Sequence, residues 1–249
     1  MSSLLLRRGL MLSEEAKDTP EEPDTPQGEE MDAFLVAKFS FEGKTNNDTD
    51  RAIVYSSKGI GGVMRVVGTN WGAGDEYTKN GYYDGRFCTR YAGFHAQINI
   101  PVPLSRNNMT IIWNGLSYNK AGLTDSSYYA LIGSVADQDT NTSPVYIDYQ
   151  DPVGTFRSMA FGKSVVRYDT DGIKWMTPEY FCGYPLSLTQ EVQQDRTISL
   201  LCIGTMRPST SGMSRTSTKQ LYIFNKTFTP SEIEGYIRRN IDSSYELPK

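Results

Sequence analysis

The stretch that decides the fold is residues 219–237, which reads KQLYIFNKTFTPSEIEGYI. Its first part, residues 221–224, is an apolar run typical of a strand that is covered on both faces. Its second part predicts a helix, because Thr229 can cap the chain, Pro230 suits the first helical position and Glu232 completes a capping box. One face of that helix collects Ile233, Tyr236, Ile237 and Ile241. We therefore expect a strand followed by a short helix that packs onto the domain and closes it.

Upstream of this stretch, from Asp32 onward, the chain is a series of short apolar segments separated by turn signals. Several alternate with a period of two, which is typical of strands with one buried face. These are Ala37, Phe39 and Phe41, then Ile98 and Ile100, and then Val145, Ile147 and Tyr149. Denser apolar runs cover 109–113, 128–135 and 198–203, and tight turns are expected at Asn80-Gly81, Asp84-Gly85, Asn114-Gly115 and Asp171-Gly172. This pattern predicts an all-β sandwich or barrel.

Composition and charge exclude several classes of protein. Of the 249 residues, 38% are hydrophobic and 12% aromatic, which is too apolar for a disordered chain and too polar for a membrane protein. The net charge of −4 combines +2 in residues 1–12, −7 in residues 13–30 and +1 in residues 31–249. A nearly neutral body offers no field for phosphates, so we expect no nucleic acid partner. No apolar run approaches the ~20 residues of a membrane span, so we expect no membrane insertion.

The first 31 residues divide into two segments of different character. Residues 1–12, MSSLLLRRGLML, surround two arginines with apolar side chains, which is the composition of a peptide that docks into a partner's groove. The candidate docking residues are Leu4, Leu5, Leu6, Arg7, Arg8, Leu10, Met11 and Leu12. A frayed chain end is an equally good interpretation. Residues 13–31 hold eight acids and three prolines, which predicts an extended tether leading to a folded domain at residues 32–249.

Three segments resemble the concanavalin A-like, laminin G-like lectin superfamily. Residues 34–48 (FLVAKFSFEGKTNND) resemble its first strand and the turn that follows, and residues 219–237 are similar to its last strand and terminal helix. Residues 98–116 (INIPVPLSRNNMTIIWNGL) are similar to its strand with a tryptophan, here Trp113. The resemblance implies a two-sheet antiparallel jelly roll with one short C-terminal helix, here preceded by an extended N-terminal arm. It also implies ligands bound by edge loops or on a concave sheet.

The chain departs from that superfamily in two ways. Ser217, Thr218 and Lys219 stand where members often carry Asp, and the E-x-D-x-E triplet of the similar family-16 glycosidases is absent from the sequence. A glycosidase needs two carboxylates about 5–9.5 Å apart on rigid strands. Glu191 and Asp195 stand in a polar stretch instead, which favours a solvated turn or short helix.

Other catalytic residues are scarce. His95 is the single histidine and has no nucleophile motif to accompany it, so a structural role is expected. Cys88, Cys182 and Cys202 show no CxxC spacing, and we expect buried free thiols. We therefore expect that the protein is not an enzyme. The alternative is a carbohydrate-active hydrolase whose acids do not follow the familiar spacing.

Two loops are candidate binding sites. Residues 71–85 (WGAGDEYTKNGYYDG) mix aromatic rings with amide and carboxylate groups, as a site for sugar rings or a protein partner would. The candidate ligand-binding residues are Trp71, Asp75, Tyr77, Asn80, Tyr82, Tyr83 and Asp84. The alternative is that these rings fold back onto the sandwich. Asp137, Asp139 and Asn141 alternate as in a calcium loop, although Thr142 stands where such a loop needs glycine, so a polar surface loop is the other interpretation.

These observations favour a non-catalytic domain that binds a carbohydrate or a protein surface and is displayed from a larger assembly through residues 1–12. The opening lacks the continuous apolar region of a secretory signal. Lectin-like folds of similar architecture occur in fibre and decoration proteins of tailed bacteriophages, which are made in the cytoplasm and released by lysis. We therefore expect a virion surface or another released assembly. A homo-oligomer is expected, and a purely architectural subunit is a third interpretation.

Overall fold

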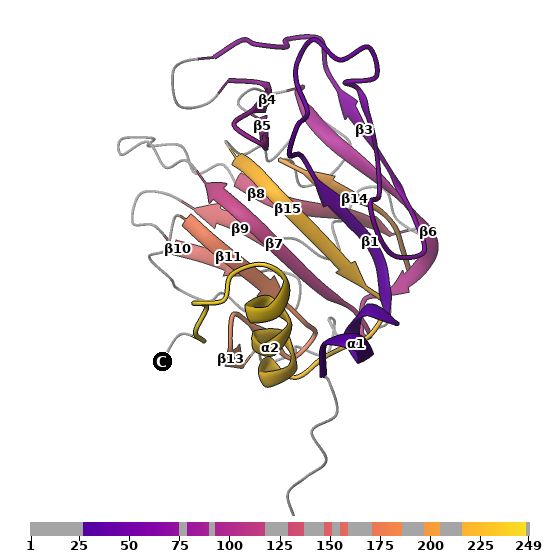
Figure 1. Cartoon of the computed structure of the whole chain (residues 1–249), viewed down its shortest axis with the longest axis vertical. Helices are drawn as coiled ribbons and strands as arrows, with labels where there is room; N and C mark the ends of the chain where they lie inside the picture. Colours follow the sequence, from indigo (N-terminus) through magenta and orange to yellow (C-terminus); the bar gives the residue numbers. More distant parts are fainter. Residues whose placement is uncertain are drawn as a thin grey trace, which may run out of the picture.

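The structure is a computed structural model, and it describes residues 27–74, 79–89, 93–117, 129–136, 147–150, 155–158, 171–185, 197–204 and 216–247. These residues form two antiparallel sheets packed against each other, with a helix on the outside of one of them (Figure 1). We call the sheet that carries this helix the front sheet and the other the back sheet. The predicted all-β, two-sheet sandwich with a short C-terminal helix is confirmed.

The front sheet is built around β15 (Thr216–Phe224), the strand predicted at residues 221–224. In order across the sheet, its strands are β13 (Tyr184–Pro185), β12 (Tyr180–Phe181), β11 (Asp171–Met176), β7 (Thr110–Ser117), β15, β5 (Arg86–Thr89) and β4 (Gly81–Tyr83). The strand β1 (Leu35–Ser40) joins the same edge of β15 as β5, but it pairs with residues 220–224, whereas β5 pairs with residues 216–218. Lys219 lies at the bulge between these two parts.

The back sheet holds the strands predicted from residues 98–100, 128–135, 145–149 and 198–203, whereas those predicted from residues 37–41 and 109–113 lie in the front sheet. In order, the strands of the back sheet are β10 (Thr155–Ser158), β9 (Ile147–Gln150), β8 (Tyr129–Ala136), β14 (Thr197–Ile203), β6 (His95–Ser105), β3 (Val63–Val67) and β2 (Ile53–Tyr55). In β6, Ile98 is buried and Asn99 is exposed, which is the alternation expected of a strand with one face in the core.

The helix α2 (Pro230–Asn240) begins as the sequence predicts. The Thr229 hydroxyl accepts a hydrogen bond from the backbone N–H of Glu232, and the Glu232 carboxylate accepts one from the backbone N–H of Thr229. Its buried residues are Ile233, Tyr236 and Ile237. The Tyr236 ring packs edge-on against Phe224 of β15, with ring centroids 5.3 Å apart, so α2 lies on the front sheet. No described helix is long and apolar enough to cross a membrane.

The folded domain begins earlier than we expected. Residues 27–31, which we assigned to the extended tether, belong to the short helix α1 (Gln27–Asp32) beside α2. Met31 is 1% exposed, and the Tyr236 hydroxyl donates a 2.9 Å hydrogen bond to Asp32. The boundary at residue 32 is therefore wrong by several residues, because Met31, the single large apolar side chain among residues 27–32, is enough to anchor this turn.

Of the glycine turns that we predicted, one forms as expected and another is part of a strand that packs in the core. Asp84-Gly85 does form the turn between β4 and β5, with φ of 50° and 68°. Asn114-Gly115 instead lies inside β7, so that prediction is wrong. A Cβ on Gly115 would come within 2.5 Å of the Trp113 ring, which is fully buried and donates to the Thr218 hydroxyl at 2.9 Å. Glycine is there to make room for the indole. All three cysteines are buried and free, as predicted.

Residues 56–62 connect β2 to β3 and run along the outer edge of β1. The backbone N–H of Ser57 donates to the Lys38 carbonyl at 2.8 Å, and that of Gly61 donates to the Val36 carbonyl at 2.9 Å. Gly59 has φ of +89°, and a Cβ there would lie 2.6 Å from the Leu35 carbonyl oxygen, so this position requires glycine. The segment ties one edge of the back sheet to the edge of the front sheet.

Candidate functional site

The outer face of the front sheet is divided by α2 into two parts. One row of register partners, which we call the covered row, lies under α2 and the residues that follow it. The covered row consists of Lys38, Tyr222, Ile112 and Trp175. The Tyr236 ring packs edge-on against Tyr222, and the Trp175 indole donates to the Tyr245 hydroxyl at 3.0 Å. Tyr222, Ile112 and Trp175 are fully buried, so this half of the face is part of the packed structure.

The next row along the same strands is polar, and we call it the polar row. It consists of Ser40, Gln220, Asn114 and Ile173, which are partners in the register. Residues two apart on a strand share a face, so the polar row lies ~7 Å from the covered row. All four residues are half-buried. In the part of the chain that the structure describes, the three polar side chains make no hydrogen bond.

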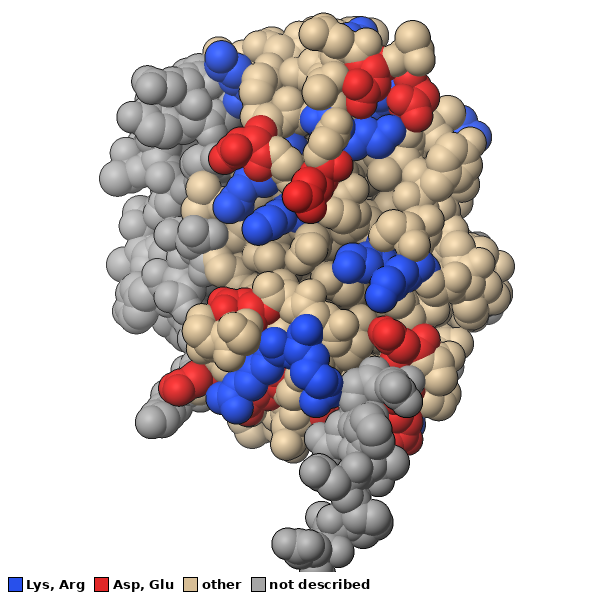
Figure 2. Space-filling view, in the orientation of Figure 1, with Lys and Arg blue, Asp and Glu red and all other residues tan. Residues whose placement is uncertain are grey.

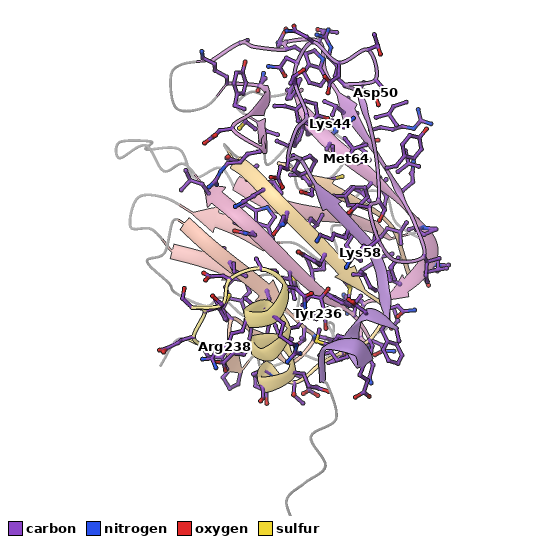
Figure 3. The ribbon with its side chains drawn as sticks, viewed as in Figure 1. Lys44, Asp50, Lys58, Met64, Tyr236 and Arg238 are labelled. Atoms are coloured by element: carbon purple, nitrogen blue, oxygen red, sulfur yellow. The ribbon has the colours of Figure 1, made fainter. Side chains whose placement is uncertain are left out.

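The polar row is uncharged and has cations at one end. Figure 2 shows a small area over the middle of the front sheet without acidic or basic side chains, and the exposed Lys219 stands next to Gln220 in β15. Basic side chains gather at the β1 edge, at the place where Figure 3 labels Lys58. Lys58 pairs with Lys38 in an isolated antiparallel bridge, which brings both side chains to the same face. A ligand on the polar row would therefore meet hydroxyl and amide groups first and ammonium groups at the edge.

The predicted binding loop, residues 71–85, packs two of its rings onto the sandwich. Tyr82 is 3% exposed and its hydroxyl donates to the Arg51 carbonyl at 2.7 Å, and burial raises the pKa of this hydroxyl. Trp71 is half-buried, with its ring edge-on to Phe94 at 5.1 Å and the Arg51 guanidinium 4.9 Å from its centroid. For these two residues the structure supports the alternative interpretation, in which the rings hold the loop on the core.

The other predicted residues of this loop differ in their surroundings. Asn80 is buried and donates to the Asn70 carbonyl at 3.1 Å, which fastens the loop to itself. Tyr83 is half-buried, with the Lys79 ammonium 5.7 Å from its ring centroid, and Asp84 is exposed at the turn. Asp75 and Tyr77 lie outside the described residues. A binding role for this loop stays a prediction.

The predicted calcium loop and docking arm also lie outside the described residues. This applies to Asp137, Asp139 and Asn141, to Leu4, Leu5, Leu6, Arg7, Arg8, Leu10, Met11 and Leu12, and to Glu191 and Asp195. Among the residues that are described, no three or more His, Cys, Asp or Glu side chains are grouped to hold a metal ion. Calcium binding and docking therefore stay predictions.

The single histidine is buried on the face of β6 opposite Ala96 and Ile98. Its Nε2 lies 3.1 Å from the Gln97 side-chain nitrogen, and its Nδ1 has no hydrogen-bond partner. Burial lowers the pKa of His95 and raises the pKa of the Cys202 thiol to about 12. Both side chains are therefore uncharged at neutral pH, which agrees with a structural role.

Comparisons with known proteins support the fold but not a family. No family model matches the sequence, and no curated protein matches it either. Among solved structures, Trypanosoma rangeli sialidase aligns with 86% of this chain at 13% identity and a TM-score of 0.52. The same sialidase with the inhibitor DANA aligns with 84% of the chain at 12% identity and a TM-score of 0.55. The present chain spans about a third of the sialidase, 34% and 33% of that protein's chain in the two alignments.

A third structure, the binding domain of botulinum neurotoxin serotype D, aligns with 83% of this chain and 51% of its own at 12% identity. Its TM-score is 0.49. The chain has the concanavalin A-like jelly-roll fold. The resemblance drawn from residues 34–48, 98–116 and 219–237 is thus confirmed for the fold. The ligand and the setting of this domain are therefore proposals.

Sequence reasoning missed the polar row. Its signal was a polar residue at the end of an otherwise apolar run, as in Asn114 after residues 109–113 and Gln220 before residues 221–224. Such residues could equally end a strand, and only the register shows that they stand side by side. Because Asn114-Gly115 is a dipeptide typical of tight turns, the sequence does not indicate that Asn114 lies within a strand.

Proposed function

We propose that this chain is a non-catalytic binding domain that holds a carbohydrate against the polar row. The observation that supports it most is that the side chains of Ser40, Gln220 and Asn114 are half-buried on three neighbouring strands and make no hydrogen bond to the described residues. Such groups bond to water in the free protein, and ligand hydroxyls can replace that water. The amides offer both donors and acceptors, which sugar hydroxyls match. Ile173 adds an apolar contact beside Asn114.

The site is tested by removing the amides one at a time. We expect Asn114→Ala and Gln220→Ala to weaken retention of the full chain on a mixed glycan array, because each removes two groups that a ligand would pair with. The matched control is Asn99→Ala, which removes an exposed amide from the back sheet. Loss of retention in Tyr83→Ala with no change in Asn114→Ala would move the site to the loop predicted from the sequence.

A protein surface is the second candidate ligand, and a different observation favours it. Tyr55 and Ile60, at and after the end of β2, are 68% and 58% exposed, and a protein partner that covers this edge would bury both side chains. Contact with a protein through this edge would be weakened by Tyr55→Ser and left unchanged by Asn114→Ala. The two ligand classes therefore depend on different residues and can be told apart.

We also propose that the domain does not cleave its ligand, and the alternative hydrolase can be tested directly. Full-length protein incubated with mixed polysaccharides is expected to retain glycan without releasing reducing ends. Release of reducing ends would overturn the non-catalytic proposal. An enzyme of this kind would need two carboxylates about 5–9.5 Å apart.

The larger setting that we propose is a released assembly such as a virion, in which residues 1–12 anchor the domain as an accessory or fibre-type protein. The apolar and basic composition of the arm and the acidic tether support it. Deletion of residues 1–12 is expected to abolish incorporation into the assembly, and unchanged incorporation would remove the anchoring role. For the proposed homo-oligomer, the measurement is the mass of the full chain in solution, where a monomer would contradict it.

A further inference from the structure

Two lysines stand side by side at the β1 edge of the front sheet, and their positive charges repel each other. Lys38 and Lys58 are partners in an antiparallel bridge, joined by the 3.2 Å hydrogen bond from the Lys38 backbone N–H to the Lys58 carbonyl. Side chains of such partners stand on one face with Cβ atoms about 5 Å apart, and like charges placed this way repel. The structure therefore accepts a local electrostatic penalty at this position.

The Lys38 side chain is not fully exposed to solvent, so water does not fully screen this repulsion. Its ammonium group rests 5.0 Å from the centroid of the Tyr222 ring, its partner in β15, and the side chain is half-buried. Burial lowers the pKa of Lys38, and the positive charge of Lys58 lowers it further. The negative charge of Asp32 acts in the opposite direction, but as the weakest of the three influences.

The acid that could neutralise this pair is already engaged elsewhere. The Asp32 carboxylate accepts the 2.9 Å hydrogen bond from the Tyr236 hydroxyl of α2. Other lysines on the described surface have closer acidic partners: Lys44 lies 3.2 Å from the Asp50 carboxylate, and Lys226 lies 3.7 Å from that of Glu30. Among the described residues, no ion pair of this kind is found at Lys38 or Lys58.

We propose that Lys38 and Lys58 form a binding site for an anionic group, a carboxylate or a sulfate, on an acidic carbohydrate whose hydroxyls lie along the polar row. This inference rests on the proposed function and specifies its ligand. The Tyr222 ring is a positioning element, because it holds the Lys38 ammonium at the surface through a cation–π contact. One anion between two ammonium groups removes their repulsion and gains two charge-assisted hydrogen bonds.

The spacing of the two rows sets the shape of this ligand. Ser40 follows Lys38 by two residues on β1, so the anion site and the polar row are ~7 Å apart along the strand. From Lys58 across β1 and β15 to β7 are three strand spacings, or about 14 Å. The ligand is therefore longer than one sugar ring and carries its negative charge at the end nearer to the β2–β3 segment.

The test compares binding of the full chain to polygalacturonate, dextran sulfate and neutral dextran. We expect the two anionic polymers to bind, and we expect Lys58→Gln and Lys38→Gln to weaken that binding about tenfold, in line with loss of one charge-assisted hydrogen bond. The control variant is Lys44→Gln, which changes the net charge equally but lies outside the proposed site, in the loop after β1. We expect it to weaken binding less than about twofold. Equal weakening by Lys44→Gln and Lys58→Gln would overturn the site, since the attraction would then be unspecific.

A second measurement uses inorganic sulfate and thermal unfolding, and it does not depend on any glycan. At constant ionic strength, sulfate in place of chloride is expected to raise the Tm of the unmodified chain more than that of Lys58→Gln. In chloride alone, Lys58→Gln is expected to unfold at the same or a higher temperature, because the repulsion is gone. A lower Tm in chloride, or an equal response to sulfate, would contradict the anion site.

The two proposals can fail separately. If Asn114→Ala has no effect while Lys58→Gln weakens binding, the anion site stands and the polar row does not bind the ligand. If neutral dextran binds as well as the acidic polymers and only Asn114→Ala matters, the proposed function stands and the anion site is wrong. For the positioning role, Tyr222→Phe keeps the ring and is expected to bind normally, whereas Tyr222→Leu is expected to weaken anion binding.

Discussion

The covered row and the polar row stand on the same strands and the same face, yet they differ in how deeply they are buried. Tyr222 and Trp175 are fully buried under α2 and the residues after it, whereas Gln220 and Ile173, two residues away on the same strands, are half-buried and are covered by none of the helices that the structure describes. The difference is not in the strands, because the register is shared. It lies in what α2 and the residues after it cover.

The largest expected effect separates the two rows by stability. We expect Trp175→Ala to lower the free energy of unfolding by about 3–5 kcal/mol, because a fully buried indole leaves a cavity and the Tyr245 hydroxyl loses its donor. Asn114→Ala, on the neighbouring strand in the polar row, is expected to change it by less than about 0.5 kcal/mol. Urea denaturation of both variants measures this. An equal cost would mean that Asn114 is part of the packing, and the comparison would fail.

A smaller effect on stability is expected in residues 56–62, the segment that runs along β1. Gly59→Ala should destabilise the protein by about 1–3 kcal/mol, because the residue has positive φ and its Cβ would clash with two carbonyl oxygens of β1. Gly43→Ala is the control, since Gly43 also has positive φ but has nothing within 4 Å of the added Cβ. The difference in destabilisation between the two variants gives the cost of the clash alone, because both glycines have positive φ. If thermal unfolding shows equal losses, residues 56–62 do not hold β1 as described.

The helix α2, which covers one row, can be destabilised at its N-cap residue, Thr229. Thr229→Ala removes the cap of α2 and is expected to cost about 1 kcal/mol, while glycan retention by the polar row should not change. Ser231→Ala, at an exposed position in the first turn, serves as the control and should cost less. The measurement is the denaturation midpoint of each variant alongside its retention. Loss of retention in Thr229→Ala alone would show that the polar row depends on the helix.

Two tyrosines of the covered half differ in one hydrogen bond. Tyr236→Phe breaks the bond to Asp32 and is expected to cost about 1 kcal/mol. The buried Tyr222 hydroxyl has no hydrogen-bond partner among the described residues, so Tyr222→Phe should leave stability unchanged or raise it. Denaturation of the two variants in parallel tests this contrast. A clear loss in Tyr222→Phe would mean that its hydroxyl makes a contact that the packing does not show.

The smallest expected effect concerns the buried histidine of the back sheet, His95. Burial lowers the pKa of His95, so the folded protein binds its proton less readily than the unfolded chain does. Stability is therefore complete above about pH 6.5 and is lost as pH falls, by at most about 0.8 kcal/mol between pH 8 and pH 6. Denaturation at several pH values should show this decline and its absence in His95→Gln. An unchanged decline in that variant would assign it to other groups.

The sequence predicts the strands better than the site. Phe39 and Ile98 alternate with polar residues, so their burial could be predicted from a period of two. Asn114 and Gln220 could not be assigned in this way, because a polar residue beside an apolar run fits a turn, a strand end or an exposed strand position. Trp71 and Tyr82 are ambiguous for a related reason: aromatic rings in a loop suit both a ligand and the core. Only their neighbours Phe94 and Arg51 decide between these interpretations.

The amino-acid sequence by itself determined the class of fold, the position of α2 and its cap, and the near neutrality of the folded body. These follow from local periodicity, capping geometry and charge, which depend on residues close together in the chain. The tertiary structure alone decided that Lys58 stands beside Lys38, that Asn114 stands beside Gln220, and that α2 covers one row but not the next. The physical reason is that strand register brings together residues distant in sequence, and no local pattern records which partners will meet.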